Sequence, residues 1–236
     1  MVKKCMSRQN LQSLTGLLQH AVNVIRPGRP FLHRLYALQQ VVTRPSHHIR
    51  LNAAAWGDIM WWHIFVNKWK GISLAWDLGC HSPEITVYSD ASGSWGCGGY
   101  TTTDWFQYKW LAHHQDLSIA SKELIPVVIS AAIFGRCWSG KLVNFMVDNL
   151  AVVQALQATY SRDIHLMHLI RLLVLFAAHF NFWFTASHVA GKKNTCDAIS
   201  RNDTEILQQL PVLLVQSITW TCTSWIQPLD SIFRQL

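Results

Sequence analysis

The order of segments after residue 84 constrains the fold of this chain more than any other feature of the sequence. Residues 84–90, 94–101 and 104–110 have the residue types of strands, and the turn Ala-Ser-Gly-Ser joins the first two. Beyond these strands we expect a helix over 119–134, a strand over 141–148, helices over 149–159 and 163–179, a strand over 180–187 and a helix that begins near Thr195. The order β-β-β-α-β-α-α-β-α predicts an α/β fold with a five-stranded mixed sheet and flanking helices.

The first third of the chain has a different pattern, which is helical, aromatic and basic. Helices are expected over 7–25, with Ser7 as N-cap, and over 31–42 and 51–69. The Arg-Pro-Gly-Arg-Pro segment ends the first helix, and residues 71–84 have the composition of a linker. We therefore expect a small helical region over 1–75, an α/β domain over 83–203 and a tail over 204–236 that has no assignment.

The composition favours a folded chain with a polyanionic partner. Half of the 236 residues are hydrophobic and only 14% are charged, which supplies a sizeable core and argues against disorder. The formal net charge of +7 favours a polyanion, and the arginines between residues 26 and 50 are either phosphate contacts or a solvated face. Six cysteines without a Cys-x-x-Cys pair argue against a zinc site or a disulfide framework. The N-terminus lacks the apolar core of a secretory signal, so we expect an intracellular protein, cytoplasmic or nuclear.

One apolar stretch, residues 166–184, has the length of a membrane span. It contains His168, Arg171, His179 and Asn181, and its pattern changes near Phe180. A buried helix that runs into a central strand explains this pattern better, so no membrane association is expected.

Four carboxylates at the edges of apolar segments carry the functional signal: Asp90, Glu123, Asp148 and Asp197. An unpaired charge in such a place is costly, and a chain with only 13 acidic residues has few to spare, so a shared cation is indicated. Singly, each has another explanation as a turn residue, a helix cap or a first-turn helix charge. Jointly, the topology puts Asp90 on a central strand, Asp148 at the end of a neighbouring strand and the other two acids on helices packed on the sheet. Two divalent ions about 3.5–4 Å apart, held by carboxylates, are the usual machinery for attack on a phosphodiester, so the pattern predicts a nuclease.

These segments resemble the type 1 ribonuclease H domain that follows the reverse transcriptase in retroelement polyproteins. VYSDASGSWGCGGY resembles its first two strands, KELIPVVISAAIFGRCW the helix with the glutamate, and KLVNFMVDNLAVV the strand that ends in an aspartate. SHVAGKKNTCDAISR resembles the closing motif and is the most specific of the four. The resemblance spans about residues 83–203 and implies a ribonuclease H-like fold.

The N-terminal segments LTGLLQHAVNVIRPGRPFLHRL and WWHIFVNKWKGIS are similar to the thumb and connection region of DIRS-like retroelements. The sequence has no YxDD-type motif, so no polymerase site is expected. The resemblance therefore implies a C-terminal fragment of a retrotransposon reverse transcriptase, or a host gene derived from one, with the polymerase portion as a possible partner.

The resemblance also implies roles for individual residues. Asp90, Glu123 and Asp148 would bind two Mg²⁺ ions, with Asp90 bridging them and Mn²⁺ as a substitute, and Asp197 would complete the second site. His188 matches a mobile histidine that assists product release or proton transfer; the alternative is an exposed loop histidine without a role. The residues expected near the nucleic acid are Ser92, Gly93, Asn149, Lys192 and Lys193.

The function implied is that of a metal-dependent endoribonuclease that cleaves the RNA strand of RNA/DNA hybrids. Two alternatives stay open. One is a non-catalytic module that binds hybrids or serves as a connection domain, although members of that kind lose acids and all four are present here. The other is an integrase-like nuclease of the same superfamily, which would have three acids in a different spacing. A decayed retroelement copy is a further possibility.

Overall fold

The structure is a computed structural model that describes residues 5–41, 44–68, 82–191, 194 and 196–203. The chain divides into two compact units, one containing the described residues up to 68 and the other those from 82 onward. The expected tail over 204–236, most of the expected linker, Lys192 and Lys193 lie outside the described residues.

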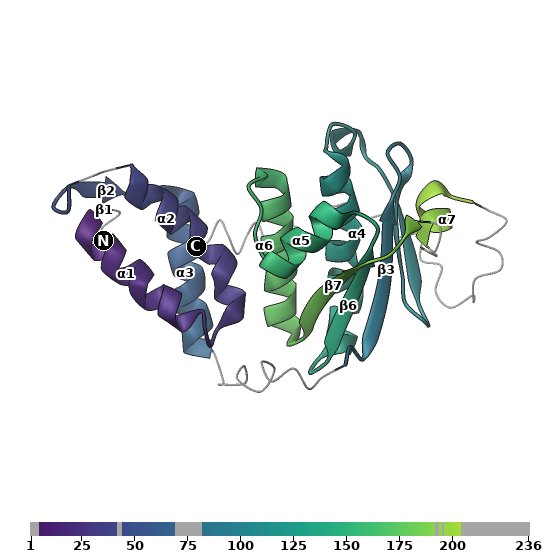
Figure 1. Ribbon diagram of the computed structural model, residues 1–236, viewed down its shortest axis with the longest axis horizontal. Coiled ribbons are helices and arrows are strands. Elements are labelled where there is room, and N and C mark those ends of the chain that lie inside the picture. Colours follow the sequence, from purple (N-terminus) through teal and green to yellow (C-terminus); the bar gives the residue numbers. More distant parts are fainter. Residues whose placement is uncertain (1–4, 42–43, 69–81, 192–193, 195, 204–236) are drawn as a thin grey trace. The chain divides into compact units, whose positions relative to one another are not determined.

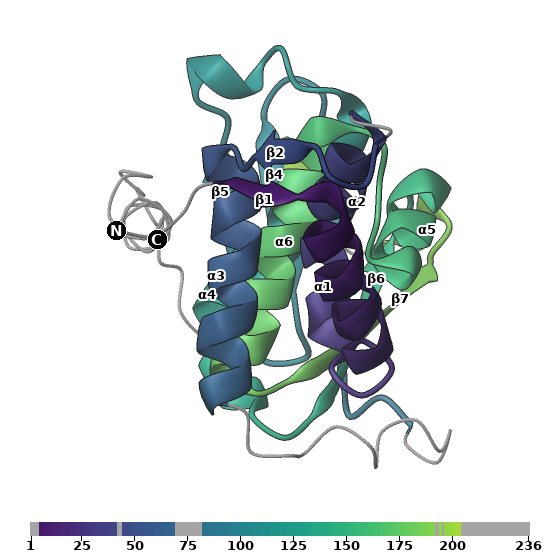
Figure 2. The same cartoon turned by 90° about the vertical axis from the view of Figure 1, so that its left-hand side faces the viewer.

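The first unit is a small helical body with a short β-ribbon at one end (Figure 2). Its helices are α1 (Arg8–Ala21), η1 (Arg26–Phe31, a 3₁₀ helix), α2 (His33–Gln40) and α3 (Ala53–Lys68), and its strands are β1 (Cys5–Ser7) and β2 (His48–Arg50). The N-cap prediction is correct, because Asn10 N donates to Ser7 Oγ at 3.2 Å. Helix α1 ends at Ala21 and not at residue 25, because the proline-rich segment winds as a 3₁₀ helix of its own.

Aromatic side chains pack together in the interior of the first unit, beside buried aliphatic residues such as Leu11 and Leu35. Phe31 stacks on Trp61 with ring centroids 4.1 Å apart, and Trp61 stacks in turn on Phe65 at 4.7 Å. Gly28 has no side chain because the Trp62 ring occupies that space, only 2.1 Å from where a Cβ would lie. The aromatic content of the first third of the sequence is thus used for packing.

The second unit is built on one five-stranded mixed sheet, as predicted. Its strands are β3 (Ile85–Ala91), β4 (Gly96–Tyr100), β5 (Trp105–Lys109), β6 (Leu142–Val147) and β7 (Trp183–His188). The spatial order is β5-β4-β3-β6-β7, with antiparallel pairing among the first three and parallel pairing of β3 with β6 and of β6 with β7. The prediction that the strand after residue 180 is central was wrong: among the described residues β7 pairs with β6 alone and forms an edge of the sheet.

Helices cover both faces of this sheet (Figure 1). They are α4 (Ile119–Phe134), α5 (Leu150–Ala158), α6 (Ile164–Phe180) and α7 (Cys196–Arg201), with 3₁₀ helices η3 (Ala112–His114) and η4 (Gly135–Trp138). A Cβ on Gly98 would meet Ile199 of α7, and one on Gly99 would meet Ser130 of α4. Neighbouring residues of a strand point to opposite faces, so α4 and α7 lie on opposite sides of the sheet.

The apolar stretch over 166–184 divides into two elements. Helix α6 ends at Phe180, its C-cap Asn181 adopts the left-handed conformation at φ 58°, and β7 begins at Trp183. Among the described residues, no helix has both the length and the apolar character needed to cross a membrane.

Candidate metal centre

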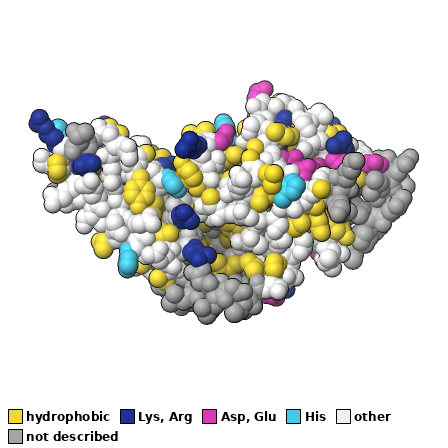
Figure 3. All heavy atoms as spheres, in the orientation of Figure 1, with side chains coloured by type: hydrophobic (Ala, Val, Ile, Leu, Met, Phe, Trp, Pro, Cys, Tyr) yellow, Lys and Arg dark blue, Asp and Glu magenta, His cyan; other side chains and the backbone are white. Residues whose placement is uncertain are grey.

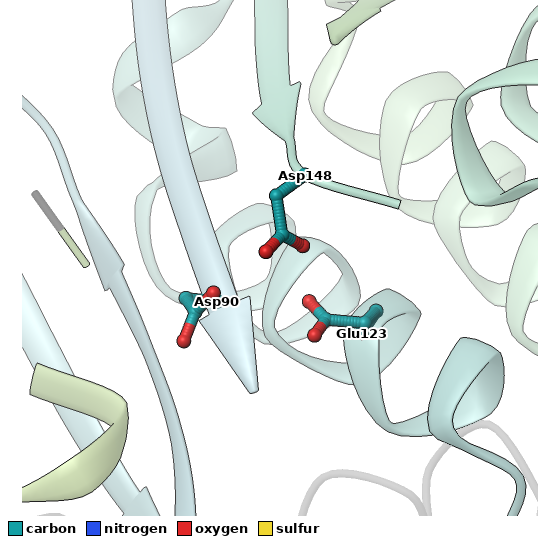
Figure 4. Close-up of side chains that lie close together, drawn as sticks. All are labelled: Asp90, Glu123 and Asp148. Atoms are coloured by element: carbon teal, nitrogen blue, oxygen red, sulfur yellow. The ribbon is translucent and has the colours of Figure 1, made fainter. Parts of the chain in front are cut away.

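Three of the predicted carboxylates meet at one edge of the sheet (Figure 4). Asp90 belongs to β3, Asp148 directly follows β6, and Glu123 belongs to α4. One oxygen from each lies within 4.8 Å of the others. Because β3 and β6 are parallel neighbours, their carboxyl ends lie at the same edge, which brings Asp90 and Asp148 together although they are 58 residues apart in the chain.

Glu123 reaches this edge from the helix. Helix α4 begins at Ile119, and Ser118 caps it by accepting a hydrogen bond from Ser121 N at 3.2 Å. Glu123 therefore lies beyond the first turn, and the first turn of α4 contains no acidic residue. A favourable interaction with the helix start does not explain its position, whereas its direction toward Asp90 and Asp148 does (Figure 4).

Burial and mutual repulsion disfavour the charged forms of two of these acids. Asp90 is 4% exposed and Glu123 5% exposed. Burial is the main cause that raises the pKa of Glu123 to about 9, and the charges of Asp90 and Asp148 add to it. Burial also raises the pKa of Asp90 to about 6, against the lowering effect of a hydrogen bond from Ser200. Without a cation, the protein holds these groups in an electrostatically unfavourable arrangement.

No described basic side chain forms an ion pair with these carboxylates, although the charge of Arg201 lowers the pKa of Asp90. Among the residues that the structure describes, none of the three carboxylates forms a salt bridge with lysine, arginine or histidine. Glu123 Oε2 is buried, and no described residue gives it a hydrogen-bond partner. An orphaned oxygen beside two further carboxylates is a set of donors that fits a hard divalent cation such as Mg²⁺ or Mn²⁺.

Two thiols lie near the carboxylates but are unsuited to bind such an ion. Burial raises the pKa of Cys97 and of Cys196 well above the ordinary value, and the nearby acids raise it further. Both thiols are therefore neutral near pH 7, and a neutral thiol is a poor metal ligand. Among the described residues, the metal-ligand group at this edge of the sheet consists of carboxylate oxygens.

The closing motif supports Asp90 directly, a contact that sequence reasoning missed. Ser200 Oγ donates to Asp90 Oδ2 at 2.5 Å, and Asn194 Nδ2 lies 3.4 Å from Asp90 Oδ1 and donates to the Ser89 carbonyl at 2.9 Å. Asn194 also accepts a hydrogen bond from the backbone N–H of Cys196, the first residue of α7. The only available signal was the presence of both residues in the segment that resembles the closing motif.

Asp197 is not part of the three-carboxylate cluster. It lies in the first turn of α7 with 46% of its side chain exposed, and its Oδ1 accepts from Arg201 Nε at 2.8 Å. Its charge nevertheless contributes to raising the pKa of both Asp90 and Glu123, so it acts on the cluster from nearby.

His188 and Asn149 flank the end of β6. His188, the exposed last residue of β7, has its Nε2 3.1 Å from the backbone carbonyl of Asp148. A carbonyl only accepts hydrogen bonds, so Nε2 carries a proton in this contact. Asn149 is the N-cap of α5, where its Oδ1 accepts from Ala151 N and Val152 N at 3.0 and 3.4 Å. The side chain of Asn149 therefore stabilises the start of α5.

Ser92 and Gly93 form the turn between β3 and β4. Ser92 Oγ accepts from Trp95 N and Gly96 N, both at 2.9 Å, so this hydroxyl closes the turn. Gly93 is exposed, and an added Cβ would meet no atom within 4 Å. The buried Lys122 holds the turn in place by donating to the Gly93 carbonyl at 2.8 Å.

Comparison with known proteins gives structural matches only. No protein-family model and no curated protein matches this chain. The similar solved structures include the N-terminal RNase H domain of Rv2228c from Mycobacterium tuberculosis, fused to maltose binding protein, and RNase H1 from the halophilic archaeon Halobacterium salinarum NRC-1. The first has 13% identity and a TM-score of 0.39 and covers 55% of this chain and 100% of its own. The second has 10% identity and a TM-score of 0.40, and the match covers 50% of this chain and 96% of the archaeal chain. Both TM-scores are below 0.5, so the strand order and the carboxylates of this chain carry the functional argument.

Proposed function

We propose that this protein is a metal-dependent endoribonuclease that cleaves the RNA strand of RNA/DNA hybrids. The observation that carries the proposal is the cluster of Asp90, Glu123 and Asp148, whose oxygens lie within 4.8 Å of one another without a described cationic partner. Its place at the carboxyl ends of two parallel central strands supports the same function, because such edges are where α/β folds bind their ligands.

In this proposal the three clustered acids hold two divalent ions, Mg²⁺ or Mn²⁺. When bound, the ions supply a water activated for attack on phosphorus and neutralise charge on the leaving 3′-oxygen. Asp90 accepts a hydrogen bond from Ser200, and in this proposal it is the acid that would be shared by the two ions. Asp197 would join the second site by exchanging its contact with Arg201 for one with the ion.

The surface beside the cluster offers groups to an RNA strand. The open space around Gly93 allows the β3–β4 turn to approach a sugar-phosphate backbone closely. Asn149 uses its Oδ1 for the helix cap, so its Nδ2 is the group it would donate to a 2′-hydroxyl. Protonated His188 Nε2 lies beside the end of β6, where it could assist product release, and Lys192 and Lys193 would contact phosphates.

The wider setting is also part of the proposal. The resemblance of residues 1–75 to a thumb and connection region supports a reverse transcriptase fragment from a retroelement, with the polymerase portion as partner and an intracellular location. In this setting the helical first unit would bind the hybrid together with the nuclease unit.

The test is cleavage of a hybrid labelled on both strands, with Mg²⁺, by the wild-type protein and by Asp148→Asn. Asp116→Asn is the matched control, because Asp116 is exposed and outside the cluster. We expect the RNA strand alone to be cut, with loss in Asp148→Asn and no change in Asp116→Asn. Binding of the hybrid without cutting would replace the proposal by a non-catalytic hybrid-binding module. Cutting of the DNA strand would favour an integrase-like nuclease instead.

A further inference from the structure

Ser200 makes a contact that the packing of its helix does not require. It is fully buried on α7, and its Oγ lies 2.5 Å from Asp90 Oδ2 and 3.0 Å from the Asp197 carbonyl one turn earlier. Ser130 on α4 is a matched case, since it is also fully buried and its Oγ donates to the Pro126 carbonyl at 2.8 Å. A buried helical serine can therefore be satisfied within its own helix.

The single hydroxyl proton of Ser200 has two acceptors to choose between. A carboxylate is the stronger acceptor because the bond to it is charge-assisted, and it is also the nearer one here. The hydroxyl therefore donates to Asp90 when that side chain is ionised, which is the state that binds a cation. This bond restricts the rotation of the Asp90 carboxylate, and Asn194 near the other oxygen restricts it further.

Packing and hydrogen bonds hold helix α7 on the sheet, which fixes the position of Ser200 relative to Asp90. Ile199 occupies the space where a Cβ of Gly98 would lie, and Gly98 is the residue of β4 that pairs with Asp90. Gln107 Nε2 on β5 donates to the Ile199 carbonyl at 2.6 Å. The backbone on both sides of the Ser200–Asp90 bond is thus anchored to the same part of the sheet.

We propose that Ser200 is a positioning residue of the metal centre, orienting Asp90 for the ions and linking it to the helix that carries Asp197. The inference rests on the proposed function and concerns the same site. Groups that orient metal ligands contribute about 10- to 100-fold to metal affinity. The Ser200 hydroxyl is expected to contribute within this range.

The experiment measures Mn²⁺ binding to the full chain without nucleic acid, from the electron paramagnetic resonance signal of free Mn²⁺. Wild type is compared with Ser200→Ala, Ser200→Thr, Ser130→Ala and Asp148→Asn. We expect Ser200→Ala to bind Mn²⁺ about 10- to 100-fold more weakly, Ser200→Thr to recover most of the affinity, and Ser130→Ala to match wild type. With saturating Mn²⁺, the KM for the hybrid is expected to be unchanged in Ser200→Ala.

The outcomes separate this inference from the function on which it rests. If wild type binds no more Mn²⁺ than Asp148→Asn, the metal centre itself is rejected, and the proposed function with it. If wild type binds and cleaves, but Ser200→Ala binds within twofold of Ser130→Ala, the positioning role is rejected and the nuclease stands. Should Ser200→Ala not fold, Ser200→Cys decides by the same criterion, because it keeps the volume with a weaker donor.

Discussion

The two units of this protein treat a buried carboxylate in opposite ways. In the first unit Asp58 is 1% exposed, and Arg34 Nη1 lies 3.3 Å from its Oδ1. In the second unit Asp90 and Glu123 are buried almost as deeply, and no described basic side chain pairs with them. The acidic side chains visible in Figure 3 also gather over the second unit. A buried acid with an internal partner serves the fold, whereas a cluster without one depends on a cation from solution.

The largest expected effect is on cleavage, and it tests whether the carboxylate cluster of the second unit binds a cation. Glu123→Gln keeps the shape of the side chain but removes an anionic ligand, so cleavage of the hybrid is expected to fall at least about 10³-fold. Asp58→Asn makes the same chemical change at the internally paired acid and is expected to retain activity. Rates are compared under single-turnover conditions with saturating Mg²⁺. Retention of more than a tenth of the activity in Glu123→Gln would show that the cluster is not the metal centre.

The next effect is on stability and its dependence on pH. Burial raises the pKa of Glu123 to about 9 and that of Asp90 to about 6, so the folded protein binds more protons than the unfolded chain below those values. Stability without metal must then fall as pH rises, for Asp90 from about 4 to 6 and for Glu123 from about 4.5 to 9. Between pH 5 and pH 8 the loss from Glu123 alone is on the order of 4 kcal/mol, since one pKa unit corresponds to about 1.4 kcal/mol.

Urea unfolding at a series of pH values, in EDTA and in Mg²⁺, measures how the free energy of unfolding depends on pH. Mg²⁺ is expected to weaken this dependence, because the ion binds the charged forms of these acids. Glu123→Gln is expected to flatten it without metal. A free energy of unfolding in EDTA that stays constant or increases as pH rises would contradict the electrostatic description of the cluster.

The fold was predictable where a pattern within one segment determines the structure. The expected helix over 119–134 has the same bounds as α4, and the five expected strands are all present. Asp90, Glu123 and Asp148 could be singled out because each lies at the edge of an apolar segment, and parallel pairing of β3 with β6 then brings two of them together.

Contacts between distant segments were not predictable in this way. Strands β1 and β2 have three residues each and lie about 40 positions apart, so neither shows an alternating pattern. The Ser200–Asp90 bond joins residues 110 positions apart, and the Arg34–Asp58 pair joins two helices. Asp58 sits in an apolar helix as the only acidic residue among the first 76, yet only its spatial neighbour shows that its charge has a partner inside the unit.

A smaller effect, on stability, tests whether Asp58 of the first unit serves the fold. Asp58→Asn leaves Arg34 without its anionic partner, and the expected loss of stability is about 1–3 kcal/mol. Arg34 is 41% exposed, so water compensates part of its charge and the lower end of this range is favoured. The free energy of unfolding of the full chain in urea is the measurement, with Asp116→Asn as control. A gain in stability would mean that the cost of burying this pair exceeds its attraction.

The smallest effect concerns the exposed pair of Asp197 and Arg201. This pair is intermediate between the buried, paired Asp58 and the buried, unpaired carboxylates of the cluster. Both side chains are exposed, Arg201 by 68% and Asp197 by 46%, and they lie four residues apart on α7, so Arg201→Gln is expected to change stability by only about 0.3–0.5 kcal/mol. The same change frees the Asp197 carboxylate from a competing cation, so cleavage is expected to reach half of its maximum at about twofold lower Mg²⁺. Arg162→Gln, at an exposed arginine outside the site, is the matched control. If Arg201→Gln instead needs more Mg²⁺ than Arg162→Gln, Arg201 does not compete with the ion for Asp197, and its charge acts on the nucleic acid.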